Sequence, residues 1–329
     1  MAPANPWDPL RAWLARCGEA FEAIEPLAGD VSARRYARIR FASGGTAIAA
    51  QYPPPDALGV DGTLARYRAT TRLLAAVSVR VPEILAEAPE EGLMLVEDLG
   101  PATLFEHAAQ VSRARLEDWF RAAMAVLARV QAIPPAAVRA VNPPLDSALL
   151  RRELEQTWVA FLDPWQLAGS TRERRLLHAA LAHLCGVLGT GPQVVCHRDF
   201  MVRNLIPMAG ELGVLDHQDL RLGPRAYDLA SLLNDSLFPD PALEIALLDE
   251  MCDGGPDAPS LEEYHRAAAQ RTLKALGTFA RAGAAGSARH QALIAPTLER
   301  ALGCLARVPE TAPLVGALAR RWLCQRSAR

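Results

Sequence analysis

The chain has 329 residues, of which 50% are hydrophobic, and its formal net charge at neutral pH is −2. This length and hydrophobic content are enough for one bilobed unit or for two domains with a sizeable core. The small net charge argues against a nucleic-acid-binding protein, because binding through a general basic field needs an excess of positive charge. Arginine carries nearly all of the positive charge, since Lys274 is the only lysine.

Cysteine spacing and the lack of long apolar segments indicate a cytoplasmic protein. The chain has six cysteines and none forms a C-x-x-C pair, so we predict neither a zinc site nor a redox motif. The N-terminus lacks a basic segment followed by an apolar core, and no uncharged apolar run is long enough to span a membrane. We therefore expect a cytoplasmic protein that binds a small-molecule substrate but neither nucleic acid nor a membrane. We also expect a monomer.

The first hundred residues are predicted to form a helix, a hairpin, a second helix and a further strand. Trp7, Leu10 and Trp13 recur at helical spacing, which predicts the first helix. The three prolines at 53–55 interrupt the sheet, because proline lacks a backbone donor. The predicted ranges are a helix at 7–20, strands at 35–41 and 46–52 joined by a turn at 43–45, a helix at 63–77 and a buried strand at 93–96.

From Ser112 onward the sequence is predicted to be mostly helical. Leu116, Phe120 and Leu127 belong to one apolar stripe, and Pro134 ends that helix. The remaining predictions are helices at 149–162, 173–188 and 226–233, and capping boxes at Ser170 with Glu173 and at Ser260 with Glu263.

The stretch from 194 to 228 carries the clearest chemical signal. Two short apolar runs, at 194–196 and 213–215, are predicted strands, and each ends next to polar residues. After the first run the chain reads His197-Arg198-Asp199, with Asn204 five residues after the aspartate. Asp216 follows the second run. Three oxygen-bearing side chains are thereby placed at strand ends or in tight loops.

These residue types and this spacing are typical of phosphoryl transfer. The pattern H-R-D-x-x-x-x-N, followed by an aspartate at the end of the next strand, matches the catalytic loop and the metal-binding aspartate of kinases. Asp199 would accept the proton of the acceptor hydroxyl or orient that hydroxyl. Asn204 and Asp216 would offer Mg²⁺ the hard oxygen ligands that it prefers.

The stretch resembles the aminoglycoside phosphotransferase family, and within it the bacterial N-acetylmuramate/N-acetylglucosamine kinases. The resemblance lies in residues 197–205, 215–219 and 223–235, with support from 27–36 and 93–100. It implies an α+β, bilobed protein-kinase-like fold with a small antiparallel sheet in the N-terminal lobe. The expected lobes are 1–98, which covers the nucleotide, and 99–329, which is helical and carries the catalytic and metal-binding loops.

The resemblance also implies the cofactors, ATP and Mg²⁺, and further roles for single residues. Gly29 and Ser32 would lie in the turn over the phosphates, and backbone groups near Glu97 and Leu99 would pair with adenine. Asp228 would be buried and bond to the backbone of the catalytic loop. His197 would orient that loop through a bond to the backbone near Asp216.

Several positions depart from the usual kinase pattern. A lysine normally holds the α- and β-phosphates from the third strand, but Lys274 is far from that strand in sequence. Arg34 and Arg35 are our candidates to replace it. Met201 stands where many kinases have a cation, so we assign Arg203 to the γ-phosphate or to an acidic substituent of the sugar.

Two polar residues after the second strand are less clearly assigned. His217 is expected to be a packed, hydrogen-bonded histidine rather than a ligand. Asp219 would complete the metal shell or bind substrate hydroxyls.

Three alternatives to an amino-sugar kinase stay open at this point. The missing lysine and Met201 would suit a nucleotide-binding pseudokinase that acts as a regulatory module. An aminoglycoside-type phosphotransferase is a second possibility. A hydrolase that uses Cys196 and His197 is a third and weaker one, because adjacent residues on a strand point to opposite faces.

Overall fold

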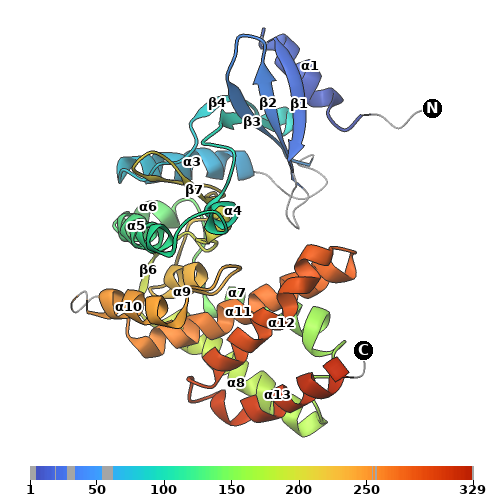
Figure 1. The fold of residues 1–329 in the computed structure, drawn as a ribbon, viewed down its shortest axis with the longest axis vertical. Helices are drawn as coiled ribbons and strands as arrows, with labels where there is room; N and C mark the ends of the chain where they lie inside the picture. Colours follow the sequence, from blue (N-terminus) through green and yellow to red (C-terminus); the bar gives the residue numbers. More distant parts are fainter. Residues whose placement is uncertain are drawn as a thin grey trace. The chain divides into compact units, whose positions relative to one another are not determined.

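The computed structural model describes residues 5–18, 20–27, 34–53, 62–253, 255 and 258–327. The described chain divides into two compact units (Figure 1), one made of residues 1–102 and 206–219 and the other of residues 103–205 and 220–329. None of the described helices is both long enough and apolar enough to cross a lipid bilayer.

An antiparallel sheet forms the centre of the first unit. In the described part of this unit, five strands follow the order β1-β2-β3-β5-β4. The hairpin predicted between the second and third strands is present, with Arg38 opposite Ile48, and Ile48 in turn lies opposite Val96. The bounds are β1 Phe21–Leu27, β2 Arg35–Phe41, β3 Thr46–Gln51, β4 Ile84–Ala88 and β5 Leu93–Glu97.

Both faces of this sheet are buried, because a helix packs on each. Helix α1 (Asp8–Arg16) places Leu10, Trp13 and Leu14 against one face, which includes Ile39 and Leu95. The other face packs against α3 (Thr63–Ala76). This core contains Leu64 and Tyr67 of the helix, and Ala50, Tyr52, Met94 and Val96 of the sheet or its end. Successive strand residues therefore face different cores, which explains the nearly continuous apolar run in β5.

A short hairpin that is distant in sequence completes the first unit. It consists of β7 (Leu205–Pro207) and β8 (Leu212–Val214). The amide of Val214 donates to the carbonyl of Arg80 at 2.8 Å. Gly213 lies so close to Leu99 that an added Cβ would be 2.5 Å from its Cδ1 atom. These contacts group 206–219 with the first unit, whereas the sequence places this segment with the helical lobe; the lobe boundary at 98 and 99 stays a prediction.

The second unit is mainly helical. Its strands β6 (Gln193–Cys196) and β9 (Arg221–Pro224) pair antiparallel. Short helical turns complete it, namely the π-helix η2 (Trp158–Leu162) and the 3₁₀-helix η3 (Val202–Asn204), as η1 (Pro89–Glu91) does in the first unit. The helices are α4 Leu104–Ala108, α5 Arg113–Gln131, α6 Pro135–Arg139, α7 Ser147–Thr157, α8 Thr171–Thr190, α9 Tyr227–Leu233, α10 Pro241–Cys252, α11 Leu261–Ala284, α12 Ala288–Leu305 and α13 Ala312–Ser327.

Local signals set several of these helix ends. The capping boxes predicted at Ser170 with Glu173 and at Ser260 with Glu263 are both present, and they begin α8 and α11. Each box satisfies backbone N–H groups that have no partner inside the helix. The side chain of Ser112 caps α5 in the simpler way, by accepting from the amide of Arg115. The capping boxes in the sequence therefore predicted the starts of α8 and α11, whereas the cap of α5 was not predicted.

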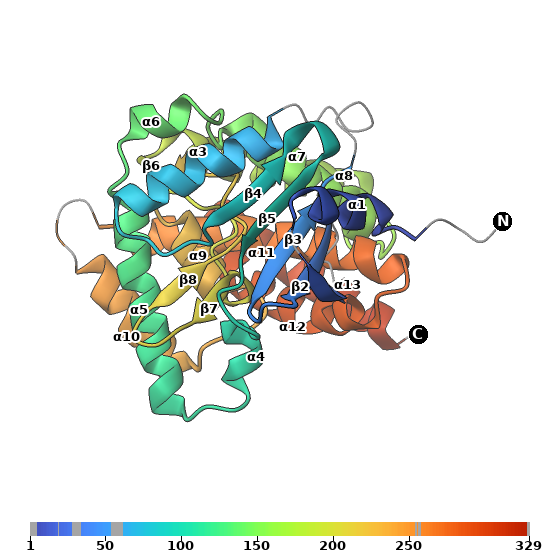
Figure 2. The same cartoon turned by 90° about the horizontal axis from the view of Figure 1, so that it is seen from above.

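Helix α11 is the central element of the second unit and packs against α7, α9 and α12 (Figures 1 and 2). Its contact with α7 is unusually close at Gly277. A Cβ atom there would lie 2.7 Å from Thr157 Oγ1 and 2.8 Å from Thr157 Cα. Thr157 also donates a hydrogen bond to the carbonyl of Leu273 at 2.8 Å. A residue without a side chain is needed at Gly277 for α11 to approach α7 this closely.

We expect Gly277→Ala to destabilise the protein by about 1–3 kcal/mol, because the new methyl group meets backbone atoms that cannot easily move. Gly303→Ala is the matched control. Gly303 also lies inside a helix, but the nearest atom to its added Cβ is the flexible end of Arg307 at 3.6 Å. The control should gain up to about 1 kcal/mol from helix propensity. Urea unfolding measures both changes, and equal midpoints for the two variants would contradict the close contact.

Candidate active site

The loop after β6 is held by a buried carboxylate. Asp228, in the first turn of α9, is fully buried and accepts from the backbone N–H groups of His197 and Arg198, the latter at 2.8 Å. Burial raises its pKa, although the two donated hydrogen bonds oppose this. Arg198 has a φ of 76°, in the left-handed region that non-glycine residues rarely adopt. The contact predicted for Asp228 is therefore present, and it stabilises an otherwise unfavourable backbone turn.

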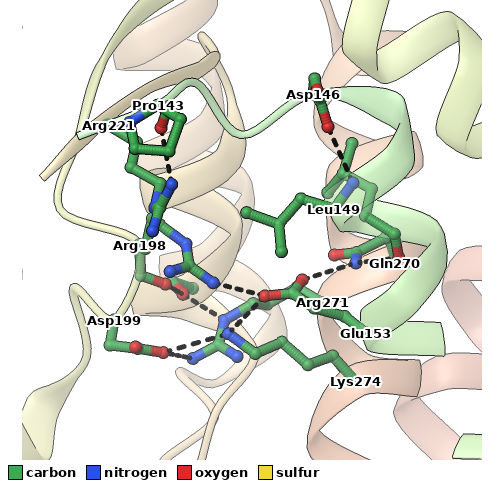
Figure 3. Close-up of polar contacts among 12 residues, drawn as sticks. Pro143, Asp146, Leu149, Glu153, Arg198, Asp199, Arg221, Gln270, Arg271 and Lys274 are labelled. Carbon is green, nitrogen blue, oxygen red and sulfur yellow. Dashed lines mark hydrogen bonds and ion pairs between the residues drawn. The ribbon is translucent and has the colours of Figure 1, made fainter. Parts of the chain in front are cut away.

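Asp199, which follows this turn, lies between two cations. Its Oδ1 atom is 2.9 Å from Arg271 Nη2 and 3.5 Å from Lys274 Nζ, and Figure 3 shows both side chains directed at it from α11. Burial alone would raise the pKa of Asp199. The nearby charges of Lys274 and Arg271 outweigh burial and hold this pKa below its usual range. Asp199 is therefore ionised at neutral pH.

A second carboxylate connects the cations on its other side. Glu153 of α7 is buried, lies 3.3 Å from Lys274 Nζ and forms an ion pair with Arg198 (Figure 3). We call Glu153, Arg198, Asp199, Arg271 and Lys274 the charge cluster. It contains three cations and two carboxylates, so its formal charge is +1. Burial lowers the pKa of Lys274 although Asp199 opposes this, and the opposite charges of Lys274 and Arg198 lower the pKa of Glu153 against the effect of burial.

Sequence reasoning missed three members of the charge cluster: Glu153, Arg271 and Lys274. Arg271 and Lys274 are 72 and 75 residues after Asp199, so no spacing rule connects them to the catalytic loop. One signal was available. Arg271 is buried on the mainly apolar inner side of α11, and Lys274 lies one turn later, so both charged residues need a partner.

Asn204 is positioned next to the same loop. Its Nδ2 group donates to the main-chain carbonyl of Asp199 at 2.8 Å. This bond uses the amide nitrogen, so it orients the side chain without using Oδ1, the atom with which an amide binds a metal. The position and orientation of Asn204 are compatible with its predicted role as a metal ligand.

Arg203 and His197 are both packed inside the second unit. The guanidinium of Arg203 lies 4.9 Å from the centre of the Phe105 ring and 4.0 Å from Asp235. His197 is buried with an edge-to-face contact to Phe200, and its ring nitrogens have no hydrogen-bond partner among the described residues of this unit. Phosphate or sugar binding by Arg203 stays a prediction, and so does the loop-orienting bond of His197.

In the first unit, Asp216 forms an ion pair with Arg34. Arg34 Nη1 is 3.1 Å from Asp216 Oδ1 and 3.3 Å from the hydroxyl of Tyr36. Asp216 has a φ of 58°, and Gln218 Nε2 donates to it at 2.8 Å. Arg35, the other candidate for the missing lysine, is exposed at the start of β2. The structure thus brings Arg34, and not Arg35, to the predicted metal-binding aspartate.

The surroundings of the other residues predicted at the nucleotide site do not test their predicted contacts with the nucleotide. Gly29 and Ser32 lie outside the described residues. Glu97 ends β5 and its side chain forms an ion pair with Arg80, while Leu99 packs on Gly213. Pairing of their backbone with adenine stays a prediction.

His217 is a packed histidine, as expected. It is fully buried, with Nδ1 2.9 Å from Thr70 Oγ1 and its ring 4.3 Å from that of Tyr67. The role of Asp219 in metal or substrate binding stays a prediction.

Asp216 of the first unit and Asn204 of the second are each of a residue type that binds Mg²⁺, and their shared role as ligands stays a prediction. Among the described residues, no group of three His, Cys, Asp or Glu side chains could hold a metal by itself. Mg²⁺ usually takes only one or two protein ligands and obtains the rest from phosphates and water. The carboxylate of Asp216 and the amide of Asn204 are suitable ligands of this kind.

Cys196 is not suited to act as a nucleophile. Its thiol is fully buried and lies 3.5 Å from the carbonyl oxygen of Pro224. Burial raises the pKa of this thiol well above its usual value, so the reactive thiolate is not available. This geometry argues against the hydrolase alternative.

We expect Asp228→Ala to lower the free energy of unfolding by about 2–5 kcal/mol, because it leaves two buried N–H groups without an acceptor. Asp146→Ala is the control. Asp146 also accepts from a backbone amide, that of Leu149 at 2.8 Å, but at an exposed helix start. Its loss should cost about 0.5–2 kcal/mol. Denaturant unfolding measures the free energy of unfolding of both variants. Equal losses in the two variants would show that the loop does not depend on Asp228.

Comparison with known proteins identifies the family. The family model described as "Phosphotransferase enzyme family" matches residues 23–264. The chain is 32% identical over 300 residues to N-acetylmuramate/N-acetylglucosamine kinase of Pseudomonas aeruginosa, covering 83% of each protein. It is 32% identical over 278 residues to the kinase of the same name from Pseudomonas putida, covering 79% of this chain and 76% of that protein.

Solved structures show the same fold at lower identity. The macrolide 2′-phosphotransferase MphH of Brachybacterium faecium aligns with a TM-score of 0.59 and 20% identity, over 88% of this chain and 98% of that chain. The GDP and kanamycin complex of the aminoglycoside phosphotransferase APH(2″)-IIIa aligns with a TM-score of 0.62 and 14% identity, over 91% and 99% of the two chains. The predicted α+β, protein-kinase-like fold is confirmed. The chain therefore belongs to the aminoglycoside phosphotransferase family of phosphotransferase enzymes.

Proposed function

We propose that this protein transfers the γ-phosphoryl group of ATP to a hydroxyl of an amino sugar such as N-acetylmuramate or N-acetylglucosamine. The observation that carries the proposal is the state of Asp199. Its carboxylate is ionised, contacts Arg271 and Lys274, and follows a backbone turn that Asp228 holds in place. This arrangement suits a carboxylate that receives an acceptor hydroxyl during phosphoryl transfer.

Asp199 is better suited to orienting the hydroxyl than to removing its proton early. A carboxylate that two cations keep below its usual pKa is a weak base. Phosphoryl transfer usually passes through a loose transition state in which the attacking oxygen carries little new bonding. The hydroxyl proton therefore moves to Asp199 only late, when the new P–O bond is nearly formed.

The residues predicted at the nucleotide site would have the following roles. Asp216 and Asn204 would hold Mg²⁺, which when bound offsets the charge of the phosphates. Arg34 would exchange its ion pair with Asp216 for a contact to the phosphates. Backbone groups of Glu97 and Leu99 would bind adenine, and Gly29 and Ser32 would contact the phosphates.

The relatives support the amino-sugar acceptor over an aminoglycoside. The relatives at 32% identity are named for N-acetylmuramate and N-acetylglucosamine, whereas the macrolide and APH(2″) enzymes are only 20% and 14% identical to this chain. The intact Asp199, Asn204 and Asp216 favour an enzyme over a pseudokinase, because a nucleotide-binding scaffold does not need a hydroxyl-orienting carboxylate. We also infer that the protein works as a cytoplasmic monomer.

Purified protein with ATP and Mg²⁺ should release ADP in the presence of N-acetylmuramate or N-acetylglucosamine, as measured by a coupled ADP assay. Kanamycin should give no ADP release above the rate without acceptor. Asp199→Ala should abolish turnover and leave nucleotide affinity nearly unchanged, because Asp199 contacts the acceptor and not the nucleotide. No ADP release with any amino sugar would favour the pseudokinase, and full turnover by the variant would remove Asp199 from the mechanism.

Arg34→Met should raise the KM for ATP by about 10- to 100-fold, the usual cost of losing a hydrogen bond between charged groups. The matched control is Arg35→Met, which removes the same charge from the neighbouring, exposed position. It should change the KM for ATP by less than about threefold, since exposed charges are well screened. Steady-state kinetics with varied ATP provides the measurement. The assignment would be wrong if the two variants gave the same KM.

A further inference from the structure

The three cations of the charge cluster differ in how firmly they are bound. Arg271 has a side chain only 5% exposed and donates through Nε to Ser231 and through Nη2 to Asp199. Arg198 is 9% exposed and is tied to Glu153. Both guanidinium groups are therefore committed to holding the protein together.

Lys274 is the most exposed cation of the charge cluster. An ammonium group carries three N–H donors. Among the described residues, Nζ has two carboxylate neighbours, Asp199 at 3.5 Å and Glu153 at 3.3 Å. The side chain of Lys274 is 18% exposed and that of Asp199 is 30% exposed, so both side chains are partly open to solvent.

The proposed reaction needs a cation at this place. An acceptor hydroxyl on Asp199 brings a carboxylate next to a negatively charged phosphoryl group, and this repulsion must be offset in the transition state. After Asp199 the catalytic loop offers only Arg203 as a cation, and its phosphate contact stays a prediction. Met201 cannot donate, and the guanidinium of Arg203 packs on Phe105 and faces Asp235.

We propose that Lys274 is a catalytic residue whose ammonium group, bound to Asp199, donates to the phosphoryl group during transfer; this inference rests on the proposed function. The acceptor oxygen forms a bond to the γ-phosphorus as the bond from that phosphorus to the β,γ-bridging oxygen breaks. ADP leaves with the electron pair of the broken bond, and the hydroxyl proton passes to Asp199 and then to solvent. Lys274 keeps its protons throughout and contributes charge alone.

This assignment gives a reason for lysine rather than arginine at position 274. Arginine presents a planar fork that suits bidentate pairing, whereas lysine presents a compact point charge on a flexible stem. A position between two carboxylates and a moving phosphoryl group favours the compact charge. Helix α11 would thus supply from outside the catalytic loop the cation that Met201 cannot provide.

The test compares Lys274→Met, Lys274→Arg and Lys274→Ala with the control Arg289→Met, which removes a charge from an exposed position on α12. Lys274→Met should lower kcat by about 10²- to 10³-fold, as the loss of one transition-state donor does in other enzymes. The KM values for ATP and acceptor should change less than about threefold. Lys274→Arg should recover part of kcat, and ethylammonium added to Lys274→Ala should raise its rate, while Arg289→Met should match the wild type.

A rate–pH profile separates this role from a purely structural one. The charge of Lys274 lowers the pKa of Asp199, so a variant impaired only through protonation of Asp199 would lose activity on an acidic limb of the profile alone. If Lys274 only kept Asp199 ionised, kcat of Lys274→Met would return to the wild-type value above that limb. That recovery, or an unchanged kcat at all pH values, would overturn the proposal.

Two controls keep the results separable. Circular dichroism and ADP binding show whether each variant is folded. The amine rescue compares one preparation of Lys274→Ala with and without ethylammonium, so differences in folding between variants do not affect it. If the wild type turned over no acceptor, the proposed function would fail. If the wild type were active and Lys274→Met equally active, only the role of Lys274 would fail.

Discussion

The candidate active site depends on one buried carboxylate and on the hydrogen bonds that it accepts from two backbone amides. Asp228 binds the N–H groups of His197 and Arg198 where the chain leaves β6 in a left-handed turn. Such a turn is costly for a residue with a side chain, and a buried amide without an acceptor is costly as well. Asp228 offsets both costs at once. Asp199 comes next in the chain, so its position follows from this contact.

Helix α11 then decides the electrostatics of the site. It places Arg271 and Lys274 against Asp199, and it approaches α7, which carries Glu153, through the close contact at Gly277. Charged groups are expensive to bury singly, but alternating signs compensate one another. The result is a cluster that holds Asp199 ionised and leaves one ammonium group accessible. The packing of α11 against α7 therefore also places the charges that lower the pKa of Asp199.

Much of the fold was predictable because its signals are local. Strand β2 was predicted at its observed bounds, α3 within one residue, and α8 and α11 from their capping boxes. Apolar periodicity and caps act over a few residues, so a linear pattern contains them. The grouping of 206–219 with the first unit was not predictable. It depends on the pairing of Val214 with Arg80, more than a hundred residues away in sequence.

For the candidate active site, the sequence by itself predicted the residues whose spacing phosphoryl transfer requires: Asp199, Asn204 and Asp216, with Asp228 as support. They lie in one continuous stretch, so their order along the chain identifies them. Only the tertiary structure decided which cations serve them. Lys274 and Arg271 reach Asp199 from a helix more than seventy residues later, and Arg34 rather than Arg35 reaches Asp216. Coulombic partners are chosen by distance in space, and a linear sequence does not record that distance.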